Sequence, residues 1–317
     1  MIYDLTIIGG GPAGVGAGVY ASRKRLKTLF LTESFNGQSV VSDGIENWIG
    51  TIKISGAELS KNLEAHLRAY AADVVDIKTG IWVKEVSKIQ DPDTNAEAFK
   101  IVVAKGNAEE SYFSKTVLIT TGSVRRKLEA KGAEEFDNKG LTYCATCDGP
   151  LFDGKDVFVI GGGNAAFESA AQLSAYCKSV TIVNRGGSFR ADPVTVEKVL
   201  ANPKVSSVMN AQVLEVKGDK FVNAIVYKKM DTNETIERLA DGIFVEIGLI
   251  PNTSFVKDIV ELDSFGRVVV DPRTQKTNTH GIWAAGDCTD GIYHQNNIAT
   301  GDAVKALEDI YAELHTK

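Results

Sequence analysis

Short runs of apolar and β-branched residues alternate along the chain with glycine- and alanine-rich stretches of helical periodicity. The first run, Tyr3–Ile8, leads through three glycines and an alanine-rich helical stretch to a second run at Thr28–Leu31. The same order recurs from Val157–Ile160 to Val180–Val183. A strand, a glycine turn, a helix and a second strand in this order predict two βαβ units with parallel strands.

Each βαβ unit is followed by further short β-branched runs that polar turns separate. These runs are 81–89, 99–104 and 115–120 in the first half and 213–216, 221–227 and 236–247 in the second half. Each half is therefore predicted to be a nucleotide-binding sheet that carries a β-meander. A last segment, Gly281–Asp287 followed by a helical pattern to Leu314, matches neither repeat. We expect it to return and complete one of the two domains.

Two glycine fingerprints follow the first strands of the two units and align without a gap at an offset of 152 residues. The first glycine allows a tight turn, the second lets the backbone approach a pyrophosphate, and the third lets the helix pack on the strand. The helix N-terminus then stabilises the phosphate charge. A tight turn without a ligand is the alternative for either loop alone. The predicted dinucleotide-binding residues are Gly9, Gly11, Pro12, Ala13 and Gly14 in the first copy and Gly161, Gly163, Asn164, Ala165 and Ala166 in the second.

The residue that ends the second strand of such a unit meets the adenosine ribose. Glu33 has this place in the first copy, and Arg185 has it in the second. A carboxylate accepts hydrogen bonds from the ribose hydroxyls of FAD or NAD, whereas a guanidinium pairs with the 2′-phosphate of NADP. The first loop is therefore predicted to bind FAD or NAD and the second NADP, with Arg190 as a second phosphate ligand. The alternative is that both arginines are solvated surface charges.

Cys144, Cys147 and Asp148 belong to one Cys-Ala-Thr-Cys-Asp segment. A zinc site needs further ligands, but Cys177 and Cys288 are isolated, and no second CxxC and no HxxxH exists. A purely structural disulfide is rare in the cytoplasm. The segment therefore favours a dithiol that cycles, in which one thiolate attacks a partner disulfide and the other resolves the mixed disulfide. Asp148 is placed to move protons to and from the neighbouring sulfur.

Length and composition narrow the class of protein. At roughly 150 residues per domain, 317 residues predict about two domains. A formal net charge of −6 argues against nucleic acid or an anionic membrane as the partner. The uncharged stretch 5–22 holds six glycines and follows an acidic residue, so we interpret it as a nucleotide loop and not as a leader. We expect a cytoplasmic protein with no metal site.

The two dinucleotide loops, with the CxxC segment just before the second, resemble the low-molecular-weight thioredoxin reductases, a family of FAD- and NADPH-dependent homodimers. The resemblance covers essentially the whole chain. It implies an α/β fold of two Rossmann-like, three-layer ββα domains, the second inserted into the first. The implied FAD domain comprises residues 1–121 and 247–317, and the implied NADPH domain comprises residues 122–246 and carries the CxxC motif.

The same resemblance implies roles for single residues. Cys147 faces the flavin and takes electrons from it, while Cys144 attacks the disulfide of thioredoxin or another small CxxC redoxin. A rotation between the domains exchanges nicotinamide and dithiol at the flavin, with Thr121–Gly122 as a hinge. In addition to the glycine loop, the implied FAD-binding residues are Glu33, Gly37, Gln38, Asn47, Gly122, Asp287, Gln295 and Asn296.

Three departures from the family pattern modify these expectations. Gly186 stands where the family's phosphate clamp has a second arginine, so a weak preference for NADPH is expected. His294 replaces an arginine near the flavin. The segments 147–152 and 243–253 are similar to the reductase component of alkyl hydroperoxide reductase, which carries a thioredoxin-like extension before its FAD strand. Here that strand starts at Ile2 or Tyr3, so a separate acceptor is expected.

Two other hypotheses remain open from the sequence. The first keeps the flavin and the dithiol but takes electrons from NADH or from a one-electron carrier such as ferredoxin. The second is a flavin- and nucleotide-binding sensor without disulfide turnover.

Overall fold

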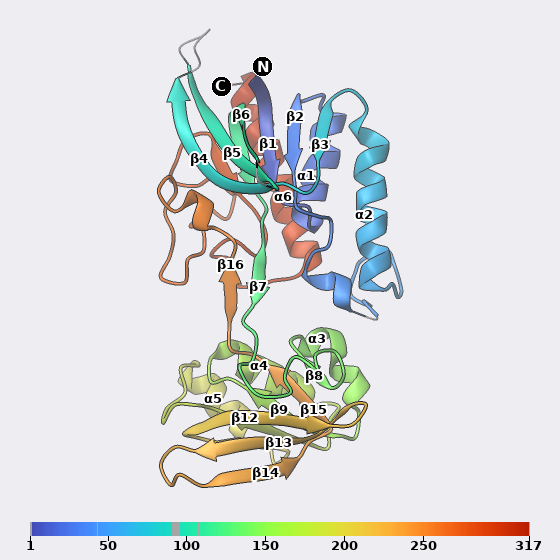
Figure 1. Cartoon of the computed structure of the whole chain (residues 1–317), viewed down its shortest axis with the longest axis vertical. Coiled ribbons are helices and arrows are strands. Elements are labelled where there is room, and N and C mark those ends of the chain that lie inside the picture. The colour runs from blue at the N-terminus through green and yellow to red at the C-terminus, as the bar shows by residue number, and fades with distance from the viewer. Residues whose placement is uncertain (1, 43, 91–95, 107, 317) are drawn as a thin grey trace. The chain divides into compact units, whose positions relative to one another are not determined.

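The computed structural model describes residues 2–42, 44–90, 96–106 and 108–316. The chain divides into two compact units, the first formed by Met1–Val124 with Ile250–Lys317 and the second by Arg125–Leu249 (Figure 1). The second unit is thus an insertion in the sequence of the first. Each unit has a mainly parallel sheet with helices on one face and further β-structure on the other, which confirms the predicted fold class.

The first unit is built on a sheet with the order β3-β2-β1-β6-β5-β4, in which β17 also pairs with β6. Strands β1, β2, β3, β6 and β17 run parallel, and β4, β5 and β6 form an antiparallel meander. The bounds are β1 (Ile2–Ile8), β2 (Thr28–Leu31), β3 (Val75–Lys78), β4 (Trp82–Gln90), β5 (Glu97–Lys105), β6 (Ala108–Ile119) and β17 (Ile282–Ala284).

Alternate residues of these strands face two different cores, because successive side chains of a strand point to opposite faces of the sheet. Phe30 packs with the helices on one face, whereas Leu29 and Leu31 pack on the other face with β4, β5 and part of segment 255–270. The helices are α1 (Pro12–Arg23), α2 (Gly56–Ala71) and α6 (Asn296–Thr316), with short 3₁₀ turns η1 (Gln38–Val41) and η3 (Ser254–Val256).

The C-terminal segment completes the first unit. Strand β17 joins the sheet beside β6, and helix α6 packs against α1. Small residues allow this close packing, since a Cβ added at Gly16 would lie 2.9 Å from the Thr300 methyl group. The Trp283 indole N–H donates to Asp309 Oδ2 at 3.0 Å and so ties β17 to α6.

The second unit has a parallel sheet with the order β11-β10-β9-β15-β8 and a separate antiparallel sheet with the order β12-β13-β14. Val157 and Val159 of β9 pack against the helices, whereas Phe158 and Ile160 pack against the antiparallel sheet. The strands are β8 (Leu141–Thr142), β9 (Asp156–Ile160), β10 (Ser179–Val183), β11 (Val205–Val208), β12 (Ala211–Gly218), β13 (Val222–Lys229), β14 (Thr235–Leu239) and β15 (Gly242–Val245). The helices are α3 (Ala145–Asp148), η2 (Gly149–Phe152), α4 (Asn164–Leu173) and α5 (Pro193–Leu200).

The expectation of one run over 236–247 was wrong. The structure has two strands there, β14 in the meander and β15 in the parallel sheet. Ala240 and Asp241 separate them, and the Asp241 carboxylate accepts a hydrogen bond from the Asp156 amide at 2.9 Å. The prediction joined the apolar residues on either side of the break into one run, although β14 is mostly exposed and β15 is buried.

The chain passes twice between the units, through β7 (Ser123–Arg125) and β16 (Leu249–Pro251), which pair with each other. Gly122 and Gly248 precede these strands with φ angles of +61° and +106°. Only glycine adopts such angles readily. The Asn252 amide donates to the Gly122 carbonyl at 3.0 Å.

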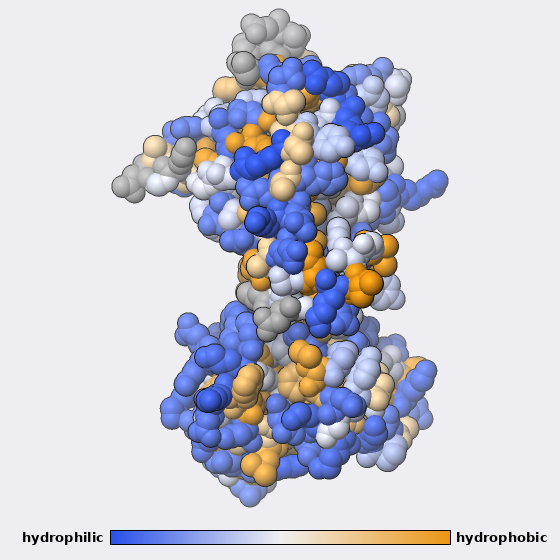
Figure 2. Space-filling view, turned by 90° about the vertical axis from the view of Figure 1, so that its right-hand side faces the viewer, coloured by the Kyte–Doolittle hydropathy of each residue, from blue (hydrophilic) through white to orange (hydrophobic). Residues whose placement is uncertain are grey.

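The surface view shows mostly hydrophilic residues, with apolar residues in smaller groups between them (Figure 2). Within the described part of the chain, no helix is long and apolar enough to cross a membrane. In the same part, no group of three or more histidine, cysteine, aspartate or glutamate side chains is arranged to hold a metal ion.

Candidate active site

The first glycine loop follows β1 and leads directly into α1. Gly9 has a φ of +121°, and a Cβ added there would lie 2.3 Å from the Thr120 carbonyl oxygen. A Cβ at Gly14 would lie 1.9 Å from the Gly9 carbonyl oxygen. By contrast, a Cβ at Gly11 would meet no atom of the described residues within 4 Å. The loop is therefore packed tightly against the protein on one side and open at Gly11, where the N-terminus of α1 begins at Pro12.

A line of polar side chains lies close to this loop in the first unit. Gln38 Nε2 donates to Asp287 Oδ2 at 3.3 Å. Asn47 Nδ2 donates to Gln295 Oε1 at 3.0 Å, and Asn296 Oδ1 accepts from the Ser39 hydroxyl at 3.0 Å. Side-chain hydrogen bonds thus connect the segment after β2 with the C-terminal segment, about 250 positions later in the sequence.

The remaining residues assigned to the first loop lie around it. Glu33 is exposed two residues after β2. A Cβ at Gly37 would lie 3.9 Å from Gly11 Cα, which places this glycine beside the open part of the loop. His294 Nδ1 lies 3.5 Å from Asp287 Oδ1, so the histidine faces the carboxylate that also binds Gln38.

The second glycine loop repeats this geometry in the second unit. Gly161 has a φ of +150°, and a Cβ there would lie 2.3 Å from the Glu246 carbonyl oxygen. A Cβ at Gly163 would meet nothing within 4 Å in the part of the chain that the structure describes, and α4 begins at Asn164. Ala166 is fully buried where the first copy has Gly14. Both loops therefore combine a strand end, a close backbone approach and an open helix N-terminus, as pyrophosphate binding requires.

The two arginines assigned to the second loop are exposed and lie near it in the chain. The Arg190 amide donates to the Gly162 carbonyl at 2.7 Å, which holds the arginine segment against the loop. Asn184, whose ordering role was missed from the sequence, stands just before the first arginine. Its buried Nδ2 donates to the carbonyls of Gly186 and Ser188 at 3.0 and 2.9 Å and fixes the turn between the two arginines.

A second residue missed from the sequence is Glu246, which follows β15. Its Oε1 accepts a hydrogen bond from the Ser169 hydroxyl at 2.7 Å. Burial raises the pKa of this carboxyl to about 7, although the Ser169 hydrogen bond opposes the shift. The only sequence signal was an acidic residue within an otherwise apolar strand end.

Cys144 and Cys147 form a disulfide with a Cα–Cα distance of 5.3 Å. Cys144 caps the N-terminus of the short helix α3, and its sulfur accepts a hydrogen bond from the Cys147 amide at 3.2 Å. Both cysteines are partly exposed. The pair therefore has the access to solvent that thiol exchange requires.

Polar residues hold the disulfide segment in place. The Thr142 hydroxyl donates to the Asp148 carboxylate and accepts a long hydrogen bond from the Cys144 amide at 3.4 Å. On the other side, Gln172 of α4 accepts from the Thr146 hydroxyl at 3.1 Å. Strand β8 and helix α4 thus position the motif from two sides.

The other two cysteines are buried. Cys177 and Cys288 are both fully inaccessible to solvent. Burial raises the pKa of each thiol to about 11. Because the thiolate is the reactive form, neither is suited to exchange.

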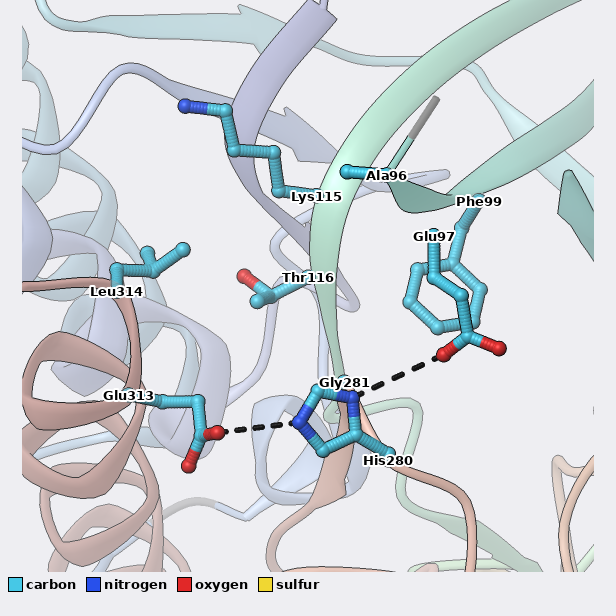
Figure 3. Close-up of a pocket in the computed structure, with 9 residues that line it drawn as sticks. All are labelled: Ala96, Glu97, Phe99, Lys115, Thr116, His280, Gly281, Glu313 and Leu314. Atoms are coloured by element: carbon cyan, nitrogen blue, oxygen red, sulfur yellow. Dashed lines mark hydrogen bonds and ion pairs between the residues drawn. The ribbon is translucent and has the colours of Figure 1, made fainter. Parts of the chain in front are cut away.

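A pocket of about 300 Å³ also lies in the first unit, but away from the glycine loop. Lys115 and Thr116 line it, and both bond to Asp4 in the first half of β1, whereas Gly9 follows the opposite end of that strand. Figure 3 shows His280 between Glu313, at 3.1 Å, and Glu97, at 3.9 Å. Among the described residues, none that is assigned to the dinucleotide sites lines this pocket.

Two Rossmann-like units, each with an open glycine loop, and a CxxC disulfide in the second unit indicate a class of protein with two dinucleotide-binding folds and a redox-capable cysteine pair. Residues 3–303 match the pyridine nucleotide-disulphide oxidoreductase family. The chain belongs to this family.

Relatives and solved structures agree with this assignment. An alkyl hydroperoxide reductase subunit of Staphylococcus aureus is 41% identical over 304 residues, which are 96% of this chain and 57% of the relative. An NADH dehydrogenase of Bacillus subtilis is 38% identical with the same coverage. The chain thus spans little more than half of these relatives. The structure of thioredoxin reductase from Streptococcus pyogenes aligns over 100% of this chain and 99% of its own, with 31% identity and a TM-score of 0.86.

Proposed function

We propose that the protein transfers electrons from NADPH through FAD and the Cys144/Cys147 disulfide to a thioredoxin-like protein disulfide. The observation that carries this proposal is the CxxC disulfide in a unit that has its own dinucleotide loop, while a second dinucleotide loop lies in the other unit. An enzyme that only oxidised a nucleotide with its flavin would have no use for the dithiol. The likeness to a thioredoxin reductase over the full length supports the acceptor class.

The FAD site is assigned to residues 1–121 and 247–317. The tight backbone of the Gly9–Gly14 loop and the space at Gly11 fit a pyrophosphate. The Glu33 carboxylate would accept hydrogen bonds from the ribose hydroxyls. The other residues assigned along the flavin are Gly37, Gln38, Asn47, Gly122, Asp287, Gln295 and Asn296.

The pyridine nucleotide is assigned to residues 122–246. The loop from Gly161 to Ala166 would hold the pyrophosphate, and Arg185 and Arg190 would pair with the 2′-phosphate of NADPH. When bound, the nucleotide would supply a hydride and the flavin would relay two electrons, which the Cys144/Cys147 disulfide would accept. The Thr121–Gly122 stretch is assigned as a hinge between the two domains.

The two cysteines have different roles in this proposal. Cys147 is assigned to accept electrons that the flavin would supply, and Cys144 is assigned to attack the partner. The Cys144 thiolate displaces one sulfur of the partner disulfide, and the Cys147 thiolate then displaces the partner's remaining sulfur from Cys144 and releases the reduced partner. Asp148 supplies and removes the protons at the adjacent sulfur. We further assign the protein to the cytoplasm and expect a homodimer.

An anaerobic titration of the flavin-loaded protein tests the donor and the acceptor separately. We expect NADPH to bleach the flavin band and, with an added thioredoxin, to be oxidised in proportion to new thiols on that thioredoxin. Bleaching without any thiol formation on thioredoxin would contradict the proposed acceptor. Equal efficiency with NADH would contradict the proposed donor.

A second candidate function uses NADH and a different small redoxin. Two observations favour it: Gly186 stands where a second clamp arginine is expected, and one relative is an NADH dehydrogenase. The relative from alkyl hydroperoxide reductase suggests peroxide-linked thiol chemistry as the destination of the electrons. The same titration, extended to a peroxide-linked redoxin as acceptor, separates this function from the first.

A further inference from the structure

The two units can be compared at one position, the residue that follows the strand paired with the first strand of each βαβ unit. This strand is β6, which pairs with β1, in the first unit and β15, which pairs with β9, in the second. The glycines Gly9 and Gly161 each approach a carbonyl of the neighbouring strand, and in both cases an added Cβ would lie 2.3 Å from its oxygen. These carbonyls belong to Thr120 in the first unit and to Glu246 in the second. A glycine with positive φ follows two residues later in both units. Thr120 and Glu246 are therefore structurally equivalent.

The side chains of Thr120 and Glu246 make different hydrogen bonds. The Thr120 hydroxyl donates to the Ile8 carbonyl at 2.9 Å, so a neutral group stands here in the first unit. In the second unit the Glu246 carboxyl accepts from Ser169, and the residue at the matching offset in the first unit is the fully buried Ala17. Since the first unit forms the same backbone with threonine and alanine, the fold does not require the carboxyl.

Glu246 lies where a ligand of this sheet is expected. From β9 the chain continues to β10 and β11 on one side, while β15 and β8 lie on the other. Ligands of open parallel sheets bind outside the carboxyl ends of the strands at such a switch point. Gly161 follows β9 and Glu246 follows β15, so both residues flank it. This step rests on the proposed assignment of the pyridine nucleotide to the second unit.

We propose that Glu246 takes up a proton from solvent when the pyridine nucleotide binds, so that nucleotide and proton bind together. A pyrophosphate carries two negative charges, and the field of these charges disfavours a buried carboxylate on the strand end that flanks the glycine loop unless this carboxylate is protonated. The charged side chains that act on Glu246 are Arg125 of β7, which favours the carboxylate, and Glu168 of α4, which disfavours it. Burial raises the pKa of Glu246 to about 7, so the carboxyl is partly ionised at neutral pH and has a proton to gain.

Calorimetric titration of the flavin-loaded protein with NAD⁺ and NADP⁺ tests this inference without any turnover. At pH 7.5, in buffers of different ionisation enthalpy, we expect the wild type to take up a substantial fraction of one proton per nucleotide and Glu246→Gln to take up less. Above pH 7 the wild-type Kd should weaken by up to about tenfold per pH unit, while the Kd of Glu246→Gln stays flatter. The 2′-phosphate of NADP⁺ titrates equally in both proteins, so the difference between them is the measure.

Two further variants should shift the midpoint of the pH dependence of nucleotide binding in opposite directions. A merely structural role of Glu246 would not produce such shifts. Ser169→Ala, which copies the residue of the first unit, removes a hydrogen bond to the carboxylate and should move the midpoint of the pH dependence to higher pH. Glu168→Gln removes a like charge and should move it to lower pH.

The calorimetric titration distinguishes a failure of the inference about Glu246 from a failure of the proposed nucleotide site. Nucleotide binding with the same proton uptake in wild type and Glu246→Gln would overturn the inference and leave the proposed function intact. If neither nucleotide bound to the wild type, both the inference and the assignment of the nucleotide to the second unit would be wrong.

Discussion

The Thr142 hydroxyl donates a hydrogen bond to the carboxylate of Asp148, the residue directly after Cys147. This bond holds the carboxylate close to the disulfide segment. If Asp148 moves protons at the sulfur, Asp148→Asn should slow reduction of the protein partner by about 10²-fold or more. Flavin bleaching by NADPH should remain fast, because that step does not use Asp148. Stopped-flow absorbance at the flavin band and a thioredoxin thiol assay measure the two steps separately.

Asp153→Asn is the matched control for this prediction. Asp153 is exposed and follows the next helical turn, η2. Its substitution should change neither step. Equal slowing by both variants would show that the loss of one negative charge in this part of the chain, and not the loss of proton transfer by Asp148, lowers the rate.

The Cys144–Cys147 disulfide leads to a prediction about the number of free thiols, which thiol counting can check. The chain has four cysteines, of which Cys177 and Cys288 are free in the oxidised protein. Denatured oxidised protein should therefore show two thiols, and protein reduced anaerobically by NADPH should show four. An unchanged count after reduction would favour the sensor hypothesis over disulfide turnover.

Substitution of single cysteines should separate their roles. Cys144→Ser should abolish partner reduction while the flavin is still bleached by NADPH, because the attacking thiolate is lost. Cys147→Ser should also abolish turnover, but its Cys144 thiolate should trap the partner as a stable mixed disulfide that is visible on a non-reducing gel. Cys177→Ala is the control, since a buried thiol with a raised pKa has no part in exchange. Full turnover by Cys144→Ser would refute the assignment.

Donor preference should depend on the arginine segment. Arg185→Ala should lower kcat/KM for NADPH by about 10-fold or more, the loss of one charge-assisted contact, and leave the value for NADH nearly unchanged. Gly186→Arg should raise the ratio of NADPH to NADH efficiency, because a Cβ at this position meets no described atom closer than 3.5 Å and the site is exposed. Steady-state kinetics with both donors checks the two variants. No change in the NADPH value for Arg185→Ala would place this arginine outside the nucleotide site.

The fold class could be predicted from sequence because its signals are local. Strand, glycine turn and helix follow one another within about 20 residues, and the same pattern occurs twice. The break between β14 and β15 was missed because the prediction joined the two strands into one run, although Asp241 and Gly242 at the break form a dipeptide typical of turns. Period and propensity do not reveal which sheet a strand joins.

Parts of the candidate site depend on contacts that no local pattern encodes. The Ser169–Glu246 bond joins residues 77 positions apart, and neither residue belongs to a glycine fingerprint. The pairing of Gln38 with Asp287 spans 249 positions, and these residues were named only through a family resemblance. The role of Asn184 in ordering the turn between the arginines was missed, because it depends on carbonyls that only the folded chain presents.

The two glycine loops should be separable by matched substitutions. Gly9→Ala places a methyl group against the Thr120 carbonyl in a backbone conformation that alanine rarely adopts, so it should reduce the flavin content of purified protein severely. Gly161→Ala makes the equivalent change in the second unit and should leave the flavin bound while NADPH no longer bleaches it. Flavin absorbance per protein and anaerobic titration measure the two effects. Loss of flavin from Gly161→Ala alone would reverse the assignment of the two loops.

Glu246 should also make the stability of the folded chain depend on pH. Burial raises its pKa from 4.5 to about 7, so between these values the native state binds more protons than the unfolded state. Stability therefore falls as pH rises from about 4.5 to about 7, and the lost contribution reaches about 3 kcal/mol above pH 7. Glu246→Gln keeps an acceptor for Ser169 but cannot ionise. It should unfold in urea at a similar concentration to the wild type at pH 5 and at a clearly higher concentration at pH 8.5. Glu129→Gln, an exposed site in the same unit, should match the wild type at both pH values. If Glu246→Gln gained no stability between pH 5 and pH 8.5 relative to these two proteins, the carboxyl would not be held in a costly ionised state.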